Sequence, residues 1–211
     1  KSCVVQADGW RAPGAPPSRE TLAAQVTRAL FDPEPTLATA QRLLLRELAT
    51  LEEELATKTL VELASDPRTS PMLIGDARSA LANRRNGAKY MLDALARHYD
   101  FLKDVLRAPP VGPMAQALAA MNEKAAAPHL AEHLLDPADT DDDVKQAAAA
   151  LAVLGSAQEV PALKQFFAMY RASAENEEMG TAVANVGQAL LKLGGPAGRT
   201  LVEQASKDDM T

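Results

Sequence analysis

The strongest constraint on the fold is that the sequence repeats itself. Residues 117–136, ALAAMNEKAAAPHLAEHLLD, align with residues 150–169, ALAVLGSAQEVPALKQFFAM, at an offset of 33 positions. Residues 48–67 align with 118–137 at an offset of 70, which also superposes two Asp-Pro pairs. A unit of 33 to 39 residues that holds two helices cannot bury its apolar face alone, so successive units must stack. The first alignment superposes Leu118 on Leu151, Pro128 on Pro161, His133 on Phe166 and Leu134 on Phe167.

Composition and local signals predict that each unit is built from helices. Aromatic residues make up only 4% of the chain, whereas alanine and leucine are abundant, which favours helices over strands. Ser70 before Pro71 is typical of an N-cap, and Thr50 with Glu53 predicts a capping box. The expected helices are a lone helix 18–31 and the pairs 36–49 with 52–65, 70–83 with 87–106, 112–122 with 126–135, 140–154 with 157–171, and 176–193 with 196–207.

The first 17 residues differ from the rest of the chain. Their prolines interrupt any helical period, which predicts an extended arm or linker over 1–17 and a repeat domain over 18–211. Because the chain starts with Lys1 rather than methionine, we interpret it as a piece of a longer protein. Cys3 is the single cysteine and leaves the redox compartment open, and a lipoprotein cysteine is the weaker alternative because no apolar signal stretch precedes it.

A recurring motif gives the repeat a family resemblance. The first helix of a unit reads A-L-x-x-L, a short turn with glycine or asparagine follows, and the second helix opens with x-x-P-x-L, as in ALAVLGSAQEVPAL and ALAAMNEKAAAPHL. This pattern resembles the HEAT-like repeat family, including the short bacterial repeats of phycobilisome lyases, most strongly over 112–207 and less so over 36–106. The resemblance implies an all-α fold, a right-handed α-α superhelix (HEAT-like solenoid) of about five helix pairs plus an N-terminal helix. It also implies a concave binding surface formed by the second helix of each pair.

Charge and hydropathy narrow the classes of partner. The 22 basic and 28 acidic side chains give a formal net charge of −6, so the chain as a whole has no cationic field that would attract nucleic acid. The longest uncharged apolar run, 147–155, is far shorter than the roughly 20 residues that cross a bilayer. We expect a soluble chain without membrane insertion. We interpret it as bacterial and leave open whether it is cytoplasmic or belongs to the cell envelope.

Residues 128–137, PHLAEHLLDP, contain the H-x-x-E-H pattern of the inverted zinc peptidases. In such enzymes both histidines hold the metal and the glutamate polarises its water. Here His129, Glu132 and His133 fall on the second helix of a repeat, and no partner motif supplies a third ligand. We interpret them as structural or partner-contacting, with His133 a candidate for the concave surface. Adventitious metal affinity is the next alternative, and catalysis is the weakest.

Three other stretches carry candidate chemistry. DTDDD, 139–143, lacks the glycine and glutamate that a calcium loop needs at its sixth and twelfth positions, so it predicts a capped, negatively charged helix start. NRRNGAKY, 83–90, is either a solvated turn bent at Gly87 or a ligand-contacting surface. Phe166 and Tyr170 are four residues apart and share a helix face, which is core more often than an exposed patch.

The leading functional hypothesis is a non-catalytic interaction or scaffold module whose partner is a protein or a neighbouring domain. No catalytic residue, cofactor or metal is expected, and the oligomeric state is left open. The alternatives are enzymes built from HEAT-like repeats, namely an alkylpurine DNA glycosylase or a tetrapyrrole lyase or chaperone. Fold-level analogy alone supports them. The candidate partner-binding residues are Arg84, Arg85, Tyr90, Arg97, His98, His129, His133 and Tyr170.

Overall fold

The computed structural model describes residues 19–98 and 108–207, and within these ranges the chain is helical and contains no strand. The all-α class predicted from the sequence is confirmed. A short 3₁₀ helix, Pro35–Leu37, precedes the second α-helix, and another, Lys124–Ala126, precedes the seventh. The α-helices are α1 (Arg19–Leu30), α2 (Ala38–Thr50), α3 (Glu54–Ser65), α4 (Pro71–Ala82), α5 (Ala88–Leu95), α6 (Val111–Ala120), α7 (Ala127–His133), α8 (Asp141–Leu154), α9 (Val160–Tyr170), α10 (Glu177–Leu193) and α11 (Gly195–Ala205).

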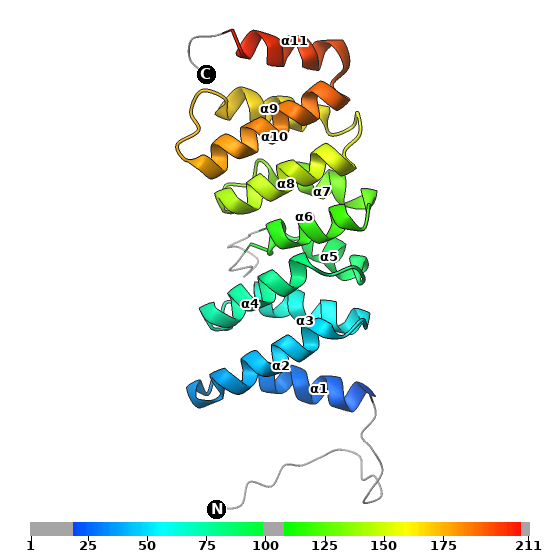
Figure 1. The fold of residues 1–211 in the computed structure, drawn as a ribbon, viewed down its shortest axis with the longest axis vertical. Helices are drawn as coiled ribbons and strands as arrows, with labels where there is room; N and C mark the ends of the chain where they lie inside the picture. The colour runs from blue at the N-terminus through cyan, green and yellow to red at the C-terminus, as the bar shows by residue number, and fades with distance from the viewer. Residues whose placement is uncertain (1–18, 99–107, 208–211) are drawn as a thin grey trace, which may run out of the picture.

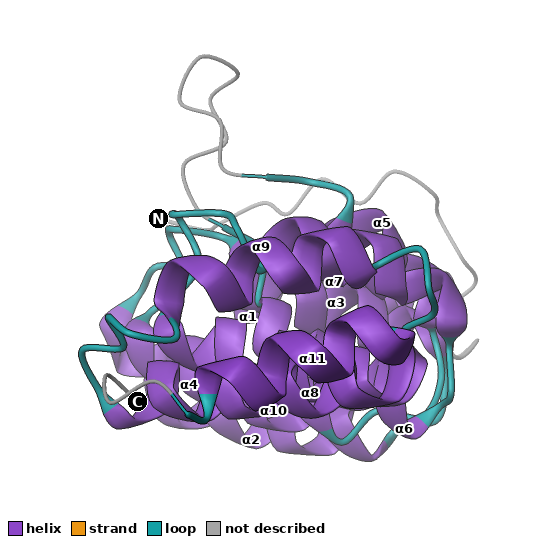
Figure 2. Ribbon diagram, turned by 90° about the horizontal axis from the view of Figure 1, so that it is seen from above, coloured by secondary structure: helices purple, strands orange, loops and turns teal. Residues whose placement is uncertain are grey.

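The helices stack in chain order along the long axis of the molecule and form two layers (Figure 1; Figure 2). In the even layer, α2, α4, α6, α8 and α10 each pack on the next. In the odd layer, α1, α3, α5, α7 and α9 succeed one another in the same way, and α11 packs on α10 at the end of the column. The first helix of every predicted pair therefore lies in the even layer. The second helices of the pairs from α3 to α9 lie in the odd layer.

Leucines at the repeat positions form the spine of the core. Leu81, Leu118, Leu151 and Leu190 lie on four successive even-layer helices, and each is fully buried. Burying one such side chain stabilises the fold by about 1.5–3 kcal/mol relative to leaving it exposed. Buried alanines lie on α6, α8 and α10, where a small side chain lets two helices approach closely. These buried alanines are Ala115, Ala117, Ala147, Ala148, Ala150, Ala182 and Ala189.

The three Asp-Pro pairs form the same turn in three different units. In each, the aspartate Oδ1 accepts a hydrogen bond from the backbone N–H two residues later, at 3.0 Å for Asp32, 2.8 Å for Asp66 and 2.9 Å for Asp136. This is the turn that aspartate side chains favour, with proline fixing the backbone between the two groups. Each Asp-Pro pair therefore forms a turn that leads the chain from an odd-layer helix to the next even-layer helix.

Two of these turns lead into the N-caps that the sequence predicts. The Ser70 Oγ accepts a hydrogen bond from the Leu73 N–H at 3.4 Å, and the Thr140 Oγ1 accepts one from the Asp143 N–H at 3.2 Å. Pro71 occupies the first turn of α4, where its missing N–H costs no intrahelical hydrogen bond. Both predicted helix starts are confirmed.

Two other local predictions are wrong. Thr50 does not cap α3, because it is the last residue of α2 and its hydroxyl donates to the Glu47 carbonyl at 2.7 Å. The helix predicted over 87–106 ends at Leu95, because the Leu95 carbonyl accepts from the His133 side chain at 2.9 Å instead of from a next helical turn. The rest of that predicted helix, 99–106, and the arm predicted over 1–17 lie outside the described residues.

A buried side chain of one unit caps the carbonyl end of a helix in the unit before it. The Gln41 amide of α2 donates to the Ala29 carbonyl at 3.0 Å and to the Asp32 carbonyl at 2.7 Å, just past the end of α1. The last carbonyls of a helix have no intrahelical donor, so these bonds satisfy groups that would otherwise be buried unpaired. Arg84 and His133 do the same at later junctions.

Candidate functional site

Arg84 joins two inter-helix turns and is only 6% exposed. Its Nε donates to the Thr57 Oγ1 at 2.8 Å, and its Nη2 donates to the Asn86 Oδ1 at 2.7 Å. The other guanidinium N–H groups reach the carbonyls of Ala49, Leu51 and Glu53, at and beyond the end of α2. Burial lowers the pKa of Arg84, and the negative charges of Glu53 and Glu52 offset only part of that lowering. Arg84 is thus buried with its donors used within the chain, and the expectation that it contacts a partner stays a prediction that these contacts do not support.

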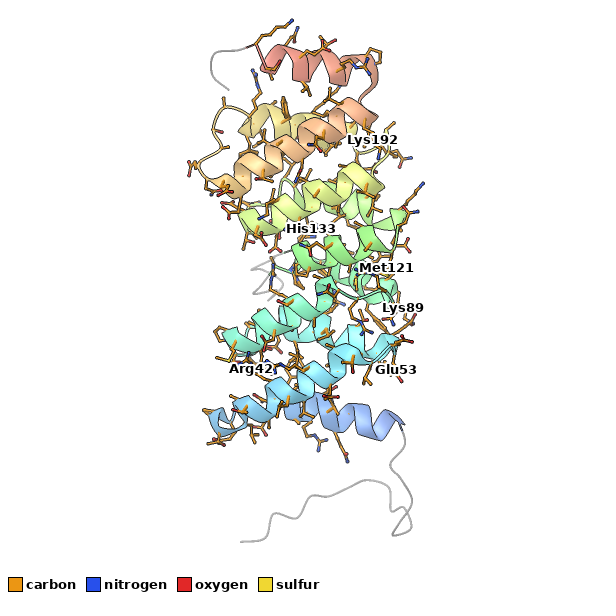
Figure 3. All side chains as sticks on the ribbon, viewed as in Figure 1. Arg42, Glu53, Lys89, Met121, His133 and Lys192 are labelled. Carbon is orange, nitrogen blue, oxygen red and sulfur yellow. The ribbon has the colours of Figure 1, made fainter. Side chains whose placement is uncertain are left out.

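The rest of the basic cluster is more accessible. Gly87 has φ +71°, and a Cβ there would lie 2.7 Å from the Thr57 Cβ, so the turn requires glycine as predicted. Arg85 is exposed. Tyr90 is half-buried beneath Lys89, whose Nζ lies 4.9 Å from the ring centroid and 2.6 Å from the Glu54 carboxylate. Lys89 lies at one side of the column in Figure 3.

All three histidines of the chain lie together where α5 ends against α7. The rings of His98 and His133 stack with centroids 4.4 Å apart and planes at 26°. His98 Nδ1 lies 2.8 Å from the Asp136 Oδ2, and its Nε2 lies 3.4 Å from the Glu132 Oε2. His129 Nδ1 lies 3.8 Å from the same Glu132 oxygen. Four candidate residues, His98, His129, His133 and the exposed Arg97 nearby in sequence, therefore surround one junction between units.

His133 is part of the core and not of the surface. Its side chain is 0% exposed, its Nδ1 lies 2.7 Å from the Asp139 Oδ2, and its Nε2 donates to the Leu95 carbonyl. Figure 3 places it near the middle of the column. A buried imidazole is tolerated when both nitrogens have partners, and here they do. The expectation that His133 contacts a partner stays a prediction, and the burial of its side chain does not support it.

His133 and Asp139 form a buried pair in which each group affects the pKa of the other. Burial lowers the pKa of His133, but the hydrogen bond and charge of Asp139, with the Leu95 carbonyl and Asp136, outweigh it, so the net pKa is raised. Burial raises the pKa of Asp139, and the hydrogen bond to His133 offsets only part of that rise. Asp136 is held as a carboxylate: burial opposes its ionisation, but the Ala138 N–H and His98 lower its pKa.

The H-x-x-E-H pattern does not form the arrangement of a zinc peptidase. Its two histidines do not share an open cleft, because His133 is buried with both nitrogens engaged and His129 lies about one-third exposed beside Glu132. His98, which belongs to the preceding unit, is the histidine that meets His133. No local sequence pattern connects His98 to the motif.

The acidic residues in the first turn of α8 have two different roles. Asp143 is 3% exposed and accepts hydrogen bonds from the Gly112 N–H at 2.6 Å and the Thr140 hydroxyl at 2.9 Å. It also forms an ion pair with Arg78, so one carboxylate links α4, α6 and α8. Asp142 instead faces solvent and pairs with Lys145 at 2.6 Å. The predicted capped helix start is confirmed, and the link to neighbouring units is a feature that the sequence did not indicate.

The aromatic pair of α9 divides between core and edge. Phe166 is fully buried, as expected. Tyr170 is half-buried, with its ring 4.8 Å from that of Phe166 and tilted by 41°. Tyr170 is thus partly accessible; it belongs to the next unit and lines a pocket together with Asp136 and Asp139 of the histidine junction.

Exposed polar side chains occur on both layers, and those of the odd layer include charged residues on α3, α5 and α7. On α5, Lys89 and Asp93 are four residues apart and exposed, and the exposed Arg97 follows two residues after the helix ends at Leu95. The corresponding exposed residues of the other odd-layer helices are Lys58 and Glu62 on α3, Glu132 on α7, and Gln165 and Met169 on α9. On the middle helices of the even layer, Asp142 is the one charged residue that is exposed, and the other exposed residues are Pro71, Met72, Gly75, Ser79, Gln116, Ala120 and Val153.

Within the part of the chain that the structure describes, no helix is long and apolar enough to cross a bilayer. Comparison of the sequence with protein-family models and with curated proteins, and comparison with solved structures, finds no match. The likeness to HEAT-like repeats stays a prediction from the sequence motif.

Proposed function

We propose that this chain is a HEAT-like helical-repeat module that binds a protein partner or a neighbouring domain on the outer face of its odd layer, without catalysing a reaction. The two-layer column supports the repeat part of this proposal. Each unit packs on the units next to it, and the second helices α3, α5, α7 and α9 lie on the same side, which is the organisation expected of a superhelical repeat protein.

The observation that carries the binding face is the row of exposed polar side chains on successive odd-layer helices. Residues four apart on a helix lie one above the other, so Lys89 and Asp93 form one row on α5, and the exposed Arg97 follows just past the end of that helix. Lys58 and Glu62 form a similar row on α3. Stacked units align such rows into one extended surface, whereas the middle of the even layer offers few charged groups.

The mixture of charges on this face favours a protein over nucleic acid. Carboxylates at Glu62, Asp93 and Glu132 alternate with the cations of Lys58 and Arg97. A phosphate backbone would be repelled by the former, while a protein surface can present complementary charges of both signs. Mixed charge patterns of this kind contribute mainly to partner specificity and association rate.

A photo-reactive amino acid placed at single positions tests the assignment in cells of the source organism. Asp93 and Gln165 sample the odd layer, and Gln116 on α6 is the matched control because it is also exposed and uncharged. We expect a discrete cross-linked protein from the odd-layer positions and not from Gln116. Arg97→Glu should weaken that cross-link, whereas Ser79→Glu on the even layer should not. Equal cross-linking from both layers, or none from Asp93 and Gln165, would contradict the proposed face.

A further inference from the structure

Several atoms at the histidine junction are of the kinds that bind metal ions, and a buried carboxylate oxygen beside them has no hydrogen-bond partner. The relevant residues, called here the His–Asp cluster, are His98, His133, Asp136 and Asp139. One ring nitrogen of each histidine and one oxygen of Asp136 lie within 4.8 Å of one another. Imidazole nitrogen and carboxylate oxygen are ligands that Zn²⁺ takes in proteins, and related divalent ions of the first transition row accept the same set.

The buried half of the cluster has unused acceptor capacity. The Leu95 carbonyl can only accept, so the His133 Nε2 carries the proton in that bond. His133 Nδ1 then faces the Asp139 Oδ2 at 2.7 Å, with both side chains fully buried, and a proton or a cation must lie between two such acceptors. The second oxygen of Asp139, Oδ1, is also buried and has no hydrogen-bond partner. An orphaned carboxylate oxygen in the core calls for a partner that the protein itself does not supply.

The surrounding contacts hold the ligands as a metal site requires. A metal-binding histidine usually donates its other N–H to a backbone carbonyl or a carboxylate, and His133 does so to Leu95. Asp136 is fixed by the Ala138 N–H at 2.9 Å. His98 is about one-third exposed and lies over His133, which leaves a path from solvent to the cluster.

In a tetrahedral zinc site, neighbouring nitrogen and oxygen ligand atoms lie about 3.4 Å apart. The ligand atoms of the His–Asp cluster are spread more widely, within 4.8 Å of one another. The partly exposed His98 ring is the group that can close this gap, by rotating out of its stack on His133. We propose that His98, His133 and Asp136, with Asp139 beside them, bind one divalent transition-metal ion of the zinc class. The ion would tie the end of α5 to α7 and to the turn before α8, and so lock two successive units together.

Metal titration of the full chain tests this assignment. The chelator-treated protein is titrated with Zn²⁺ against a competing indicator dye, and with Co²⁺ followed by its visible absorption. We expect one equivalent to bind. His98→Gln and Asp136→Asn should each weaken binding by at least about tenfold, and Asp139→Asn by about 10–100-fold as a group that supports the ligands. His129→Gln is the matched control, since it removes an accessible histidine on the same helix.

The helical content of each variant, measured by circular dichroism, separates loss of a ligand from loss of the fold. In the unsubstituted protein Zn²⁺ should raise the unfolding temperature, and in folded His98→Gln it should not. The proposal is overturned if no saturable binding occurs, if His98→Gln and Asp136→Asn bind as tightly as the unsubstituted protein, or if His129→Gln abolishes binding. The last result would assign the ion to the surface pair His129 and Glu132.

Discussion

Removing the Asp143 carboxylate should destabilise the protein far more than removing its exposed neighbour Asp142. Asp143→Ala leaves the buried Gly112 N–H without an acceptor, which costs about 1–3 kcal/mol. It also removes the ion pair with Arg78, whose side chain is 28% exposed, so solvent screening limits that loss to about 1 kcal/mol. The expected total is about 3 kcal/mol in the free energy of unfolding.

Thermal unfolding followed by circular dichroism measures this loss. For a chain of this length, 1 kcal/mol corresponds to a shift of about 2–4 °C, so Asp143→Ala should lower the unfolding temperature by about 6–12 °C. The control is Asp142→Ala: this side chain is 56% exposed, its pair with Lys145 lies at the surface, and the expected loss is below about 1 kcal/mol.

Equal losses in the two variants would refute this reasoning, because they would show that only the charge at the start of α8 matters. A loss below about 1 kcal/mol for Asp143→Ala would show that the link between α4, α6 and α8 adds nothing to stability. A double-mutant cycle with Arg78→Met isolates the ion pair, and we expect a coupling energy of about 1 kcal/mol.

Two further pairs of substitutions test the turns by urea unfolding. Gly87→Ala should cost about 2 kcal/mol or more, because alanine is strained at φ +71° and its Cβ would clash with Thr57, whereas Gly75→Ala in an open helical position should stabilise by about 0.5–1 kcal/mol. Arg84→Met should cost about 2–3 kcal/mol by leaving buried carbonyls unpaired, and Arg85→Met, at an exposed position, should stay within about 0.5 kcal/mol. A comparable loss from Arg85→Met would argue against the assigned role of Arg84.

The helical layout could be predicted because its signals are local. The helix predicted over 140–154 is α8, Asp141–Leu154, since its cap, its acidic first turn and its apolar period all lie within one segment. The capping box at Thr50 failed because Glu53, three residues later, is itself the N-cap of α3. A motif match that lies at a helix boundary does not distinguish the end of one helix from the start of the next.

The roles of individual site residues depended on contacts that no local pattern records. Arg84 was assigned to a candidate partner surface because it belongs to the basic cluster 83–90, but most of its acceptors belong to a turn about 30 residues earlier. For His133 the repeat did carry a usable signal: the 33-residue alignment superposes it on Phe166, and both side chains are fully buried. The meeting of His98 with Asp136 left no such trace in the sequence.

The buried donors that cap the preceding unit bear on how a chain of similar units avoids assembling in the wrong order. Leucine and alanine surfaces on successive helices resemble one another, so apolar packing alone would also accept a non-neighbouring unit or a unit of a second chain. The donors differ in chemistry at each junction: an amide at Gln41, a guanidinium at Arg84 and an imidazole at His133. An exchanged neighbour would leave buried carbonyls unpaired, at about 1–3 kcal/mol each. These side chains therefore give each unit an identity and disfavour packing against a unit that is not its neighbour in the sequence.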